Sequence, residues 1–192
     1  MGELSKEAGR KFLYVETSWG LSRHVARDSN FMIPMWEQGS TPLEYEYCSN
    51  YLSVTKFGQS FMTKIGIQSR YLPFPVEKQV KKDIRNPRVF LHNAGTYGGD
   101  YRKGTPEAIK IFQKSGLGKK GYLLRITALT EPRPDLKRII DASPDGIVLD
   151  IGFKASWRDI YKEGDLLLYP SRTEGHSLPV LEANSFGIPA LS

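Results

Sequence analysis

The C-terminal stretch of the chain, residues 169–192, constrains its structure more than any other segment. It reads YPSRTEGHSLPVLEANSFGIPALS and continues an apolar run that begins at Leu166, so it predicts a buried strand, a sharp turn and a helix with Pro179 in its first turn. Unpaired N–H groups at a helix N-terminus carry partial positive charge and favour a phosphate. Glu174 in the turn and Glu182 in the helix are acceptors suited to hydroxyl groups. The pattern indicates a ligand with both phosphate and hydroxyl groups, as in a nucleotide sugar. The alternative is a plain strand–turn–helix with two solvated carboxylates.

The composition predicts a soluble globular protein with one large or two small domains. The 192 residues are 40% hydrophobic and 25% charged. The single cysteine, Cys48, excludes an internal disulfide framework and fits a reducing compartment. Residues 1–20 lack the apolar centre and cleavage pattern of a signal peptide, and no apolar run is long enough to span a bilayer. These features predict a cytoplasmic protein and leave open a peripheral membrane contact, which need not show in hydropathy.

From about residue 88 onward, short apolar strands alternate with helices. Such alternation predicts a parallel sheet built from strand–helix units, in which ligands bind at the carboxyl ends of the strands. The expected strands are 89–91, 122–126, 147–151 and 165–169, and the expected helices are 105–114, 134–142, 156–162 and 177–186.

The first half of the chain is less regular. It predicts strands at 12–16, 31–34 and 51–55, helices at 42–48 and 57–65, and an extended proline-bearing segment at 69–76. Residues 77–87 are charged and poor in core residues, which is typical of a linker. The chain is therefore expected to contain a partial N-terminal α/β domain at 1–76, a linker at 77–87 and a Rossmann-like domain at 88–192.

Residues 101–140 contain ten basic and three acidic residues, so this segment alone accounts for the net charge of +6 and the rest of the chain is near neutral. A basic block suits nucleic acid, an anionic membrane or phosphorylated ligands. No nucleic-acid-binding motif accompanies it and the aromatic residues are not interleaved with the charges, so no nucleic-acid partner is expected. His24 and His92 have no carboxylate or cysteine at ligand spacing, and no Asp-x-Asp motif occurs, so the sequence predicts no metal site.

The C-terminal stretch resembles the donor-site signature of retaining glycosyltransferases of family 4 and their relatives, which have the two-domain GT-B fold. That signature reads PS-x-x-EG-x-x-LP-x-LEA-x-x-x-G-x-P, and so many residue types at fixed spacing make a specific match. Residues 55–76 and 33–37 resemble, more loosely, the end of the N-terminal, acceptor-side domain. The resemblance implies a GT-B-like α/β chain in which a Rossmann-type donor domain follows part of a second α/β domain. Both sheets are expected to be incomplete at the ends of this partial chain. The matching residues are Pro170, Ser171, Glu174, Gly175, Leu178, Pro179, Leu181, Glu182, Ala183, Gly187 and Pro189.

The resemblance also implies residues that bind the donor diphosphate. Lys103 belongs to a Lys-Gly pair just before an expected helix, where its ammonium would contact a phosphate. Thr96 and Tyr97 stand where the family has an arginine, and Arg102 is the candidate substitute. Gly95 would allow the backbone to approach the ligand.

In the motif itself, the resemblance makes Glu174 a partner of the donor sugar and, together with Lys103, a catalytic residue. Glu182 would accept hydrogen bonds from the ribose, and the backbone at 127–128 and 152–154 would lie beside the base. His176 and Ser177 stand where the family often has Phe-Gly. The His176 side chain is either an added hydrogen-bond partner of the donor or an ordinary turn residue. The remaining donor-binding positions are Gly175, His176, Ser177 and Leu178.

The function implied by the resemblance is transfer of a sugar from a nucleoside diphosphate sugar to an unidentified glycan, lipid or small-molecule acceptor, with retention at the anomeric carbon. No metal and no cofactor besides the donor substrate are expected, because a helix N-terminus and Lys103 would stabilise the leaving diphosphate. One alternative is a non-catalytic nucleotide-sugar-binding remnant or subunit, completed by a partner chain. A nucleotide-sugar epimerase or phosphorylase of the same fold is a weaker alternative, because those families carry other residues in the motif.

Overall fold

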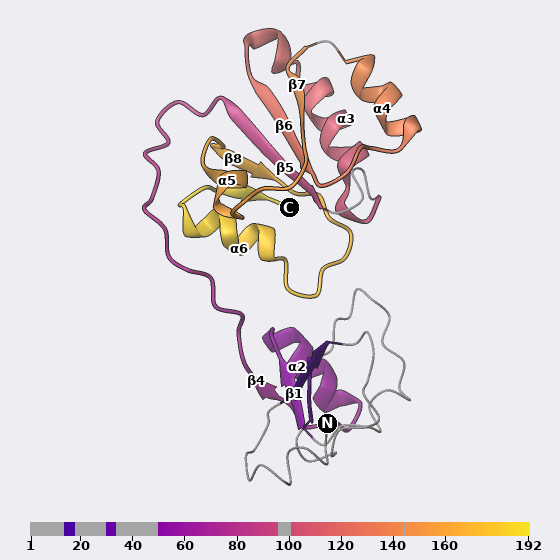
Figure 1. Ribbon diagram of the computed structural model, residues 1–192, viewed down its shortest axis with the longest axis vertical. Coiled ribbons are helices and arrows are strands. Elements are labelled where there is room, and N and C mark those ends of the chain that lie inside the picture. The colour runs from indigo at the N-terminus through magenta and orange to yellow at the C-terminus, as the bar shows by residue number, and fades with distance from the viewer. Residues whose placement is uncertain (1–13, 18–29, 34–49, 96–100, 144) are drawn as a thin grey trace. The chain divides into compact units, whose positions relative to one another are not determined.

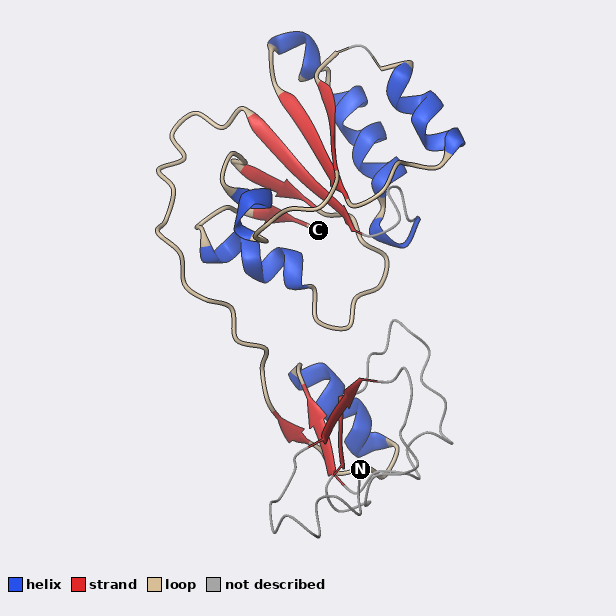
Figure 2. Cartoon of the chain, viewed as in Figure 1, coloured by secondary structure: helices blue, strands red, loops and turns tan. Residues whose placement is uncertain are grey.

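The computed structural model describes residues 14–17, 30–33, 50–95, 101–143 and 145–192 (Figures 1 and 2). The chain divides into two compact units. The first comprises residues 1–75 with 174–176, and the second comprises residues 76–173 with 177–192. Each unit contains its own parallel sheet.

The first unit contains a four-stranded parallel sheet in the order β1-β2-β3-β4. Helix α2 (Lys56–Lys64) follows β3, and the Thr55 Oγ1 caps it by accepting a hydrogen bond of 2.9 Å from the Gly58 N–H. The three predicted strands and this helix are confirmed, with ends shifted by up to two residues. The pairing of β4 with β3 was not predicted, and the helix expected at 42–48 lies outside the described residues. The strands are β1 (Tyr14–Thr17), β2 (Asn30–Ile33), β3 (Asn50–Ser53) and β4 (Arg70–Tyr71).

The second unit contains a five-stranded sheet in the order β7-β6-β5-β8-β9, with every pair of neighbours parallel. The predicted parallel α/β architecture is therefore confirmed. Because the strands are parallel, their carboxyl ends share one edge, and the strand order reverses between β5 and β8, where folds of this kind bind ligands. The strands are β5 (Val89–Gly95), β6 (Leu123–Ala128), β7 (Ile147–Ile151), β8 (Leu166–Leu168) and β9 (Ala190–Leu191).

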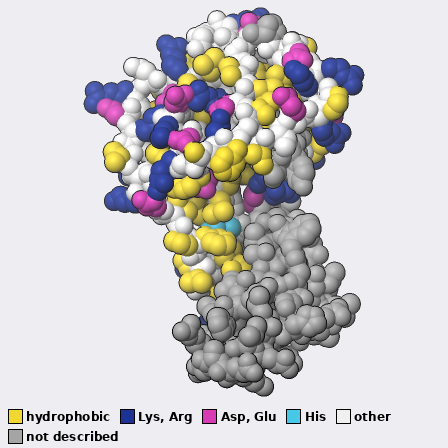
Figure 3. Space-filling view, in the orientation of Figure 1, with side chains coloured by type: hydrophobic (Ala, Val, Ile, Leu, Met, Phe, Trp, Pro, Cys, Tyr) yellow, Lys and Arg dark blue, Asp and Glu magenta, His cyan; other side chains and the backbone are white. Residues whose placement is uncertain are grey.

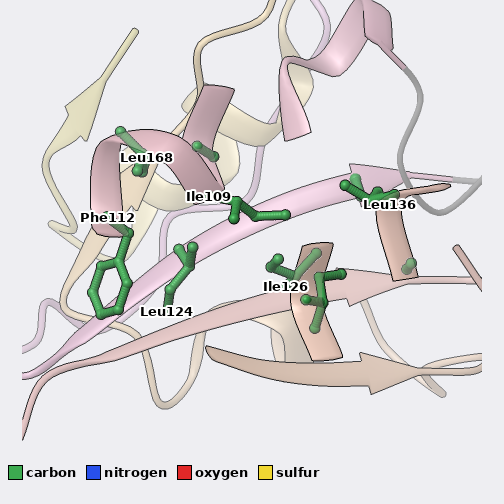
Figure 4. Packing of buried hydrophobic residues seen from close by; sticks show 10 residues of the cluster. Ile109, Phe112, Leu124, Ile126, Leu136 and Leu168 are labelled. Atoms are coloured by element: carbon green, nitrogen blue, oxygen red, sulfur yellow. The ribbon is translucent and has the colours of Figure 1, made fainter. Parts of the chain in front are cut away.

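Helices cover both faces of this sheet (Figure 1). One face packs against α3 (Thr105–Ser115) and α4 (Pro134–Asp141) in a core that includes Ile109, Phe112, Leu124 and Leu168 (Figure 4). The other face packs against α5 (Arg158–Tyr161) and α6 (Leu178–Ser185). Consecutive residues of β8 enter opposite cores, Leu167 on the α5/α6 side and Leu168 on the α3/α4 side. This alternation is the period of a strand that is buried on both faces.

Helix α5 is shorter than predicted, because its boundaries are set by hydrogen bonds that the sequence pattern did not reveal. The Arg158 N–H donates to the Ser156 Oγ, and the Ser156 N–H donates to the Asp159 carboxylate, so Ser156 is bonded on both sides just before the helix begins. Gly164 ends the turn against Leu91, since a Cβ at this position would overlap the Leu91 side chain. The single helical turn therefore lies between the hydrogen bonds of Ser156 and the close contact of Gly164 with Leu91 in β5.

The basic residues of the second unit do not form a single patch on the face that Figure 3 shows. Lys and Arg side chains there are interspersed with acidic and apolar ones. Several of them are ion-paired on the surface, including Lys137 with Asp141 and Lys162 with Asp159. Within the described ranges, no helix combines the length and hydropathy that a bilayer crossing needs.

Candidate functional site

The carboxyl edge of the second unit's sheet carries most of the residues that the sequence singled out. Gly104, between a short 3-10 turn (η4, Tyr101–Lys103) and α3, has φ +71°, and a Cβ there would overlap the carbonyl oxygen of Pro170. Only glycine fits this conformation and this contact. The Lys-Gly pair is thereby packed directly against the first residue of the motif turn.

Lys103 lies over the buried Tyr169 at the end of β8. Its Nζ donates a hydrogen bond of 2.6 Å to the Tyr169 hydroxyl and lies 5.3 Å from the ring centroid. A Cβ at Gly95 would come within 3.9 Å of the Lys103 Cε, so the end of β5 lies beside the lysine side chain. Gly95 also has φ +74°, which favours glycine. The structure thus brings together two predicted site residues, Lys103 and Gly95.

His92, on β5, is a structural residue. Its Nδ1 lies 2.9 Å from the Leu168 carbonyl oxygen and its Nε2 lies 2.8 Å from the Thr105 Oγ1, so the ring ties β5 to β8 and to the start of α3. The side chain is fully buried, and this burial lowers the pKa of His92 to about 4. The imidazole is therefore neutral and occupied on both nitrogens.

Arg102 ties the segment before α3 to the turn after β8. Its guanidinium donates to the Thr173 carbonyl at 3.2 Å, and its own carbonyl accepts from the Ser171 hydroxyl and the Arg172 N–H. Arg172 in turn pairs with Glu107 in the first turn of α3 at 2.6 Å. The region where the family has its arginine, residues 96–97, lies outside the described residues.

The residue before α6 has a left-handed backbone, at a position where family 4 glycosyltransferases often have glycine. Ser177 is the N-cap residue with φ +52°, and its side chain does not cap the helix. For a residue with a Cβ this conformation costs roughly 1–2 kcal/mol. The next residue, Leu178, is 40% exposed and opens the helix, with Pro179 in the first turn. The Ser177 side chain therefore accepts no hydrogen bond from the N–H groups in the first turn of α6.

Glu182 projects from α6 and is held by a buried tyrosine of α5. The Tyr161 hydroxyl donates a hydrogen bond of 2.8 Å to the Glu182 Oε2, and the Asn93 amide lies 3.5 Å from the same hydroxyl. Burial raises the pKa of Glu182, whereas the hydrogen bond from Tyr161 lowers it. The carboxylate is therefore partly desolvated and fixed on one side.

A cavity of about 310 Å³ lies at the ends of β5, β6 and β7. One lining residue, Thr127, has a buried Oγ1 with no hydrogen-bond partner within the described part of the chain. The cavity adjoins the groups above through two shared residues, Asn93 on the Glu182 side and Gly95 on the Lys103 side. Its lining is Asn93, Gly95, Thr127, Ala128, Leu129, Gly152, Phe153, Lys154, Trp157 and Ile160.

Three predicted site residues, Glu174, Gly175 and His176, group with the first compact unit. Within that unit, the His176 ring lies 5.3 Å from the Phe74 ring. Both ring nitrogens are buried without a hydrogen-bond partner in the described residues, and burial lowers the pKa of His176.

The second unit therefore places Lys103, Gly95 and Glu182 at one edge of its sheet, together with the start of α6. The sequence did not single out Tyr169 and Tyr161, which hold the lysine and the carboxylate, nor the unpartnered hydroxyl of Thr127. Tyr169 directly precedes the motif, which is the one signal that could have indicated it. Tyr161 carries no such signal, because its contact with Glu182 depends on how two helices pack.

Comparison with solved structures identifies chains of the same architecture at low sequence identity. The crystal structure of TarM aligns with TM-score 0.69 and 10% identity over 88% of this chain and 37% of its own. The GtfA/B complex gives 0.65 and 16% over 98% of this chain and 44% of that one. The pneumococcal O-GlcNAc transferase GtfA in complex with UDP and GlcNAc gives 0.59 and 15% over 84% and 37%.

No protein-family model matches the chain, and no curated protein matches it. The chain spans less than half the length of each solved structure described above. At this identity, the likeness shows that the chain has a GT-B-like α/β fold with a Rossmann-type parallel sheet.

Proposed function

We propose that the second unit is the donor domain of a retaining glycosyltransferase resembling family 4, which uses a nucleoside diphosphate sugar and needs no metal. The observation that carries the proposal is the arrangement along the end of β5. A cavity lies there between a fixed carboxylate, reached through Asn93, and a fixed ammonium, reached through Gly95. A nucleotide needs the same three features, namely a pocket for its base, an acceptor for its ribose hydroxyls and a positive charge for its diphosphate.

Each part of the donor has a matching group in this proposal. The base enters the cavity at the ends of β5, β6 and β7. The ribose hydroxyls donate to Glu182, and the diphosphate lies between Lys103 and the first turn of α6. The GtfA neighbour was crystallised with UDP and GlcNAc, which makes a UDP-sugar the first donor to test.

The chemistry follows from charge. Breaking the bond between the sugar and the diphosphate leaves positive charge on the sugar and negative charge on the leaving group. The Lys103 ammonium, held by Tyr169, and the N-terminus of α6 present fixed positive charge to that leaving group. Glu174 is assigned to the donor sugar on the resemblance alone. The acceptor binds in the part of the protein that includes the first unit.

Titration calorimetry tests the proposal with two pairs of ligands, UDP against UMP and GDP against GMP. A hydrogen bond to a charged group is worth about 1.5–3 kcal/mol, so the diphosphate of one pair should bind about ten- to hundred-fold more tightly than its monophosphate. Lys103→Ala should abolish that preference. Lys119→Ala, at the opposite edge of the sheet, is the matched control and should keep it.

Equal affinity for diphosphate and monophosphate in both base series would contradict the proposal. Diphosphate-selective binding without turnover of any nucleotide sugar by the full-length protein would instead favour the non-catalytic binding subunit. The GtfA/B neighbour is a complex of two chains, so turnover is best measured with any copurifying partner present.

A further inference from the structure

We propose that Tyr161 is a positioning residue: its buried hydroxyl holds the Glu182 carboxylate in place and in its ionised, hydrogen-bond-accepting form. This inference rests on the proposed function, in which Glu182 accepts hydrogen bonds from the ribose. It assigns a role to a residue of α5 that lies in the core and that the motif does not include.

The position of the Tyr161 hydroxyl is fixed by the packing of its ring. Tyr161 is 0% exposed, and its ring centroid lies 6.2 Å from that of Trp157 and 6.2 Å from that of Phe186. Trp157 and Phe186 also contact each other edge to face, with centroids 5.9 Å apart. These three rings join α5 to the end of α6. The phenol therefore cannot swing away from the carboxylate without disrupting the aromatic cluster.

The direction of the hydrogen bond is fixed by chemistry. Burial and the nearby charge of Glu182 raise the pKa of Tyr161, so the phenol stays protonated and donates. An O–H donor to a carboxylate forms a charge-assisted bond, which is stronger than a neutral one. Among the described residues the bond engages only Oε2 of Glu182, which leaves Oε1 to accept a ligand hydroxyl. The Asn93 amide, 3.5 Å from the phenol oxygen, connects this pair to the cavity.

The hydrogen bond also opposes the effect of burial on Glu182. Burial raises the pKa of this carboxyl and the Tyr161 hydroxyl lowers it, and no charged side chain in the described part of the chain adds to these two influences. Since its pKa is raised, Glu182 takes up a proton at a higher pH than an exposed glutamate does, and it then loses acceptor capacity. Removing the Tyr161 hydroxyl should raise this pKa further, so the loss should begin at higher pH.

The test is Tyr161→Phe, which removes one oxygen and keeps the ring. Affinity for UDP and GDP is measured by calorimetry at several values from about pH 8 to about pH 5. At the top of this range, the loss of positioning should weaken binding about fivefold, which corresponds to about 1 kcal/mol. The fall in affinity on acidification should move to higher pH than in the unsubstituted protein. The preference for diphosphate over monophosphate should stay unchanged, because Lys103 keeps its contacts.

Two controls separate positioning from a general effect on folding. Tyr122→Phe makes the same chemical change at the opposite edge of the sheet, where the ring packs against Phe90, and should change neither affinity nor its pH dependence. Glu182→Gln has no titrating carboxyl, so it should keep only the fall in affinity that protonation of the nucleotide's own terminal phosphate causes. In that background, adding Tyr161→Phe should produce no further shift with pH.

The outcomes distinguish this inference from the proposed function. If Glu182→Ala leaves nucleotide binding intact, the ribose role is wrong and both proposals fail. If Glu182→Ala weakens binding but Tyr161→Phe has the pH profile of the unsubstituted protein, the donor site stands and the role of Tyr161 is overturned. A lower melting temperature for Tyr161→Phe with an unshifted pH profile has the same meaning, because it shows a role in packing alone.

Discussion

Replacing Glu182 by alanine is expected to weaken binding of a free nucleoside diphosphate by about ten- to hundred-fold, the value of one hydrogen bond to a charged group. The expected partner is the ribose, which the donor and the product nucleotide share. Glu182 is held at 2.8 Å by Tyr161, so no reorganisation is needed before a ligand binds. The measurement is calorimetry with UDP and GDP, run beside the corresponding nucleotide sugars.

Glu174→Ala is the matched variant, because it removes the other carboxylate of the motif. In the proposed site Glu174 contacts the sugar and not the nucleotide. This variant should therefore bind UDP or GDP nearly normally but lose the extra affinity of the sugar-bearing donor, and with it turnover. Equal losses of free-nucleotide affinity in the two variants would show that the roles of the carboxylates are wrongly assigned.

The largest effect on stability is expected from Gly104→Ala. The backbone there has φ +71°, which costs a residue with a Cβ roughly 1–2 kcal/mol, and the added methyl group would overlap the Pro170 carbonyl oxygen. Overpacking of this kind costs about 1–3 kcal/mol, so the free energy of unfolding should fall by about 2–5 kcal/mol. Urea denaturation at fixed pH measures this loss.

Gly121→Ala separates the two causes. Gly121 has φ +79°, similar to that of Gly104, but a Cβ there would meet nothing within 4 Å. This variant should show the backbone strain alone, roughly 1–2 kcal/mol. If both variants lose the same stability, the close contact between Gly104 and Pro170 contributes nothing, and the packing of the Lys-Gly pair against the motif turn is not what positions Lys103.

The sequence predicted the helices that have clear start and stop residues. Helix α3 has Pro106 in its first turn and Gly116 as its left-handed C-cap, and Pro134 opens α4, so the ends of both were predicted within a residue. Strand β5 was predicted too short, as 89–91, because its second half contains His92 and Asn93. Those polar residues fit a buried strand because long-range hydrogen bonds to Leu168, Thr105 and Tyr161 satisfy them.

The candidate site shows the same division between local and tertiary information. Glu182 and Lys103 could be predicted because each belongs to a local motif with fixed spacing. Tyr161 and Tyr169 could not, since their hydroxyls meet partners 21 and 66 residues away in the sequence. The left-handed backbone of Ser177 was also hidden, because serine gives no sign of a positive φ where the family pattern has glycine.

A two-dimensional amide NMR titration of the chain with UDP and, separately, with GDP shows directly whether and where the second unit binds a nucleotide. We expect at least one of them to shift amide signals at the carboxyl edge of the second unit's sheet, at Gly95, at residues 152–154 and at Ser177, Leu178 and Val180. Signals at the opposite edge, such as those of Gly118 and Gly121, should stay in place. Shifts confined to that opposite edge, or no shifts with either nucleotide, would contradict a nucleotide-sugar site at the end of β5.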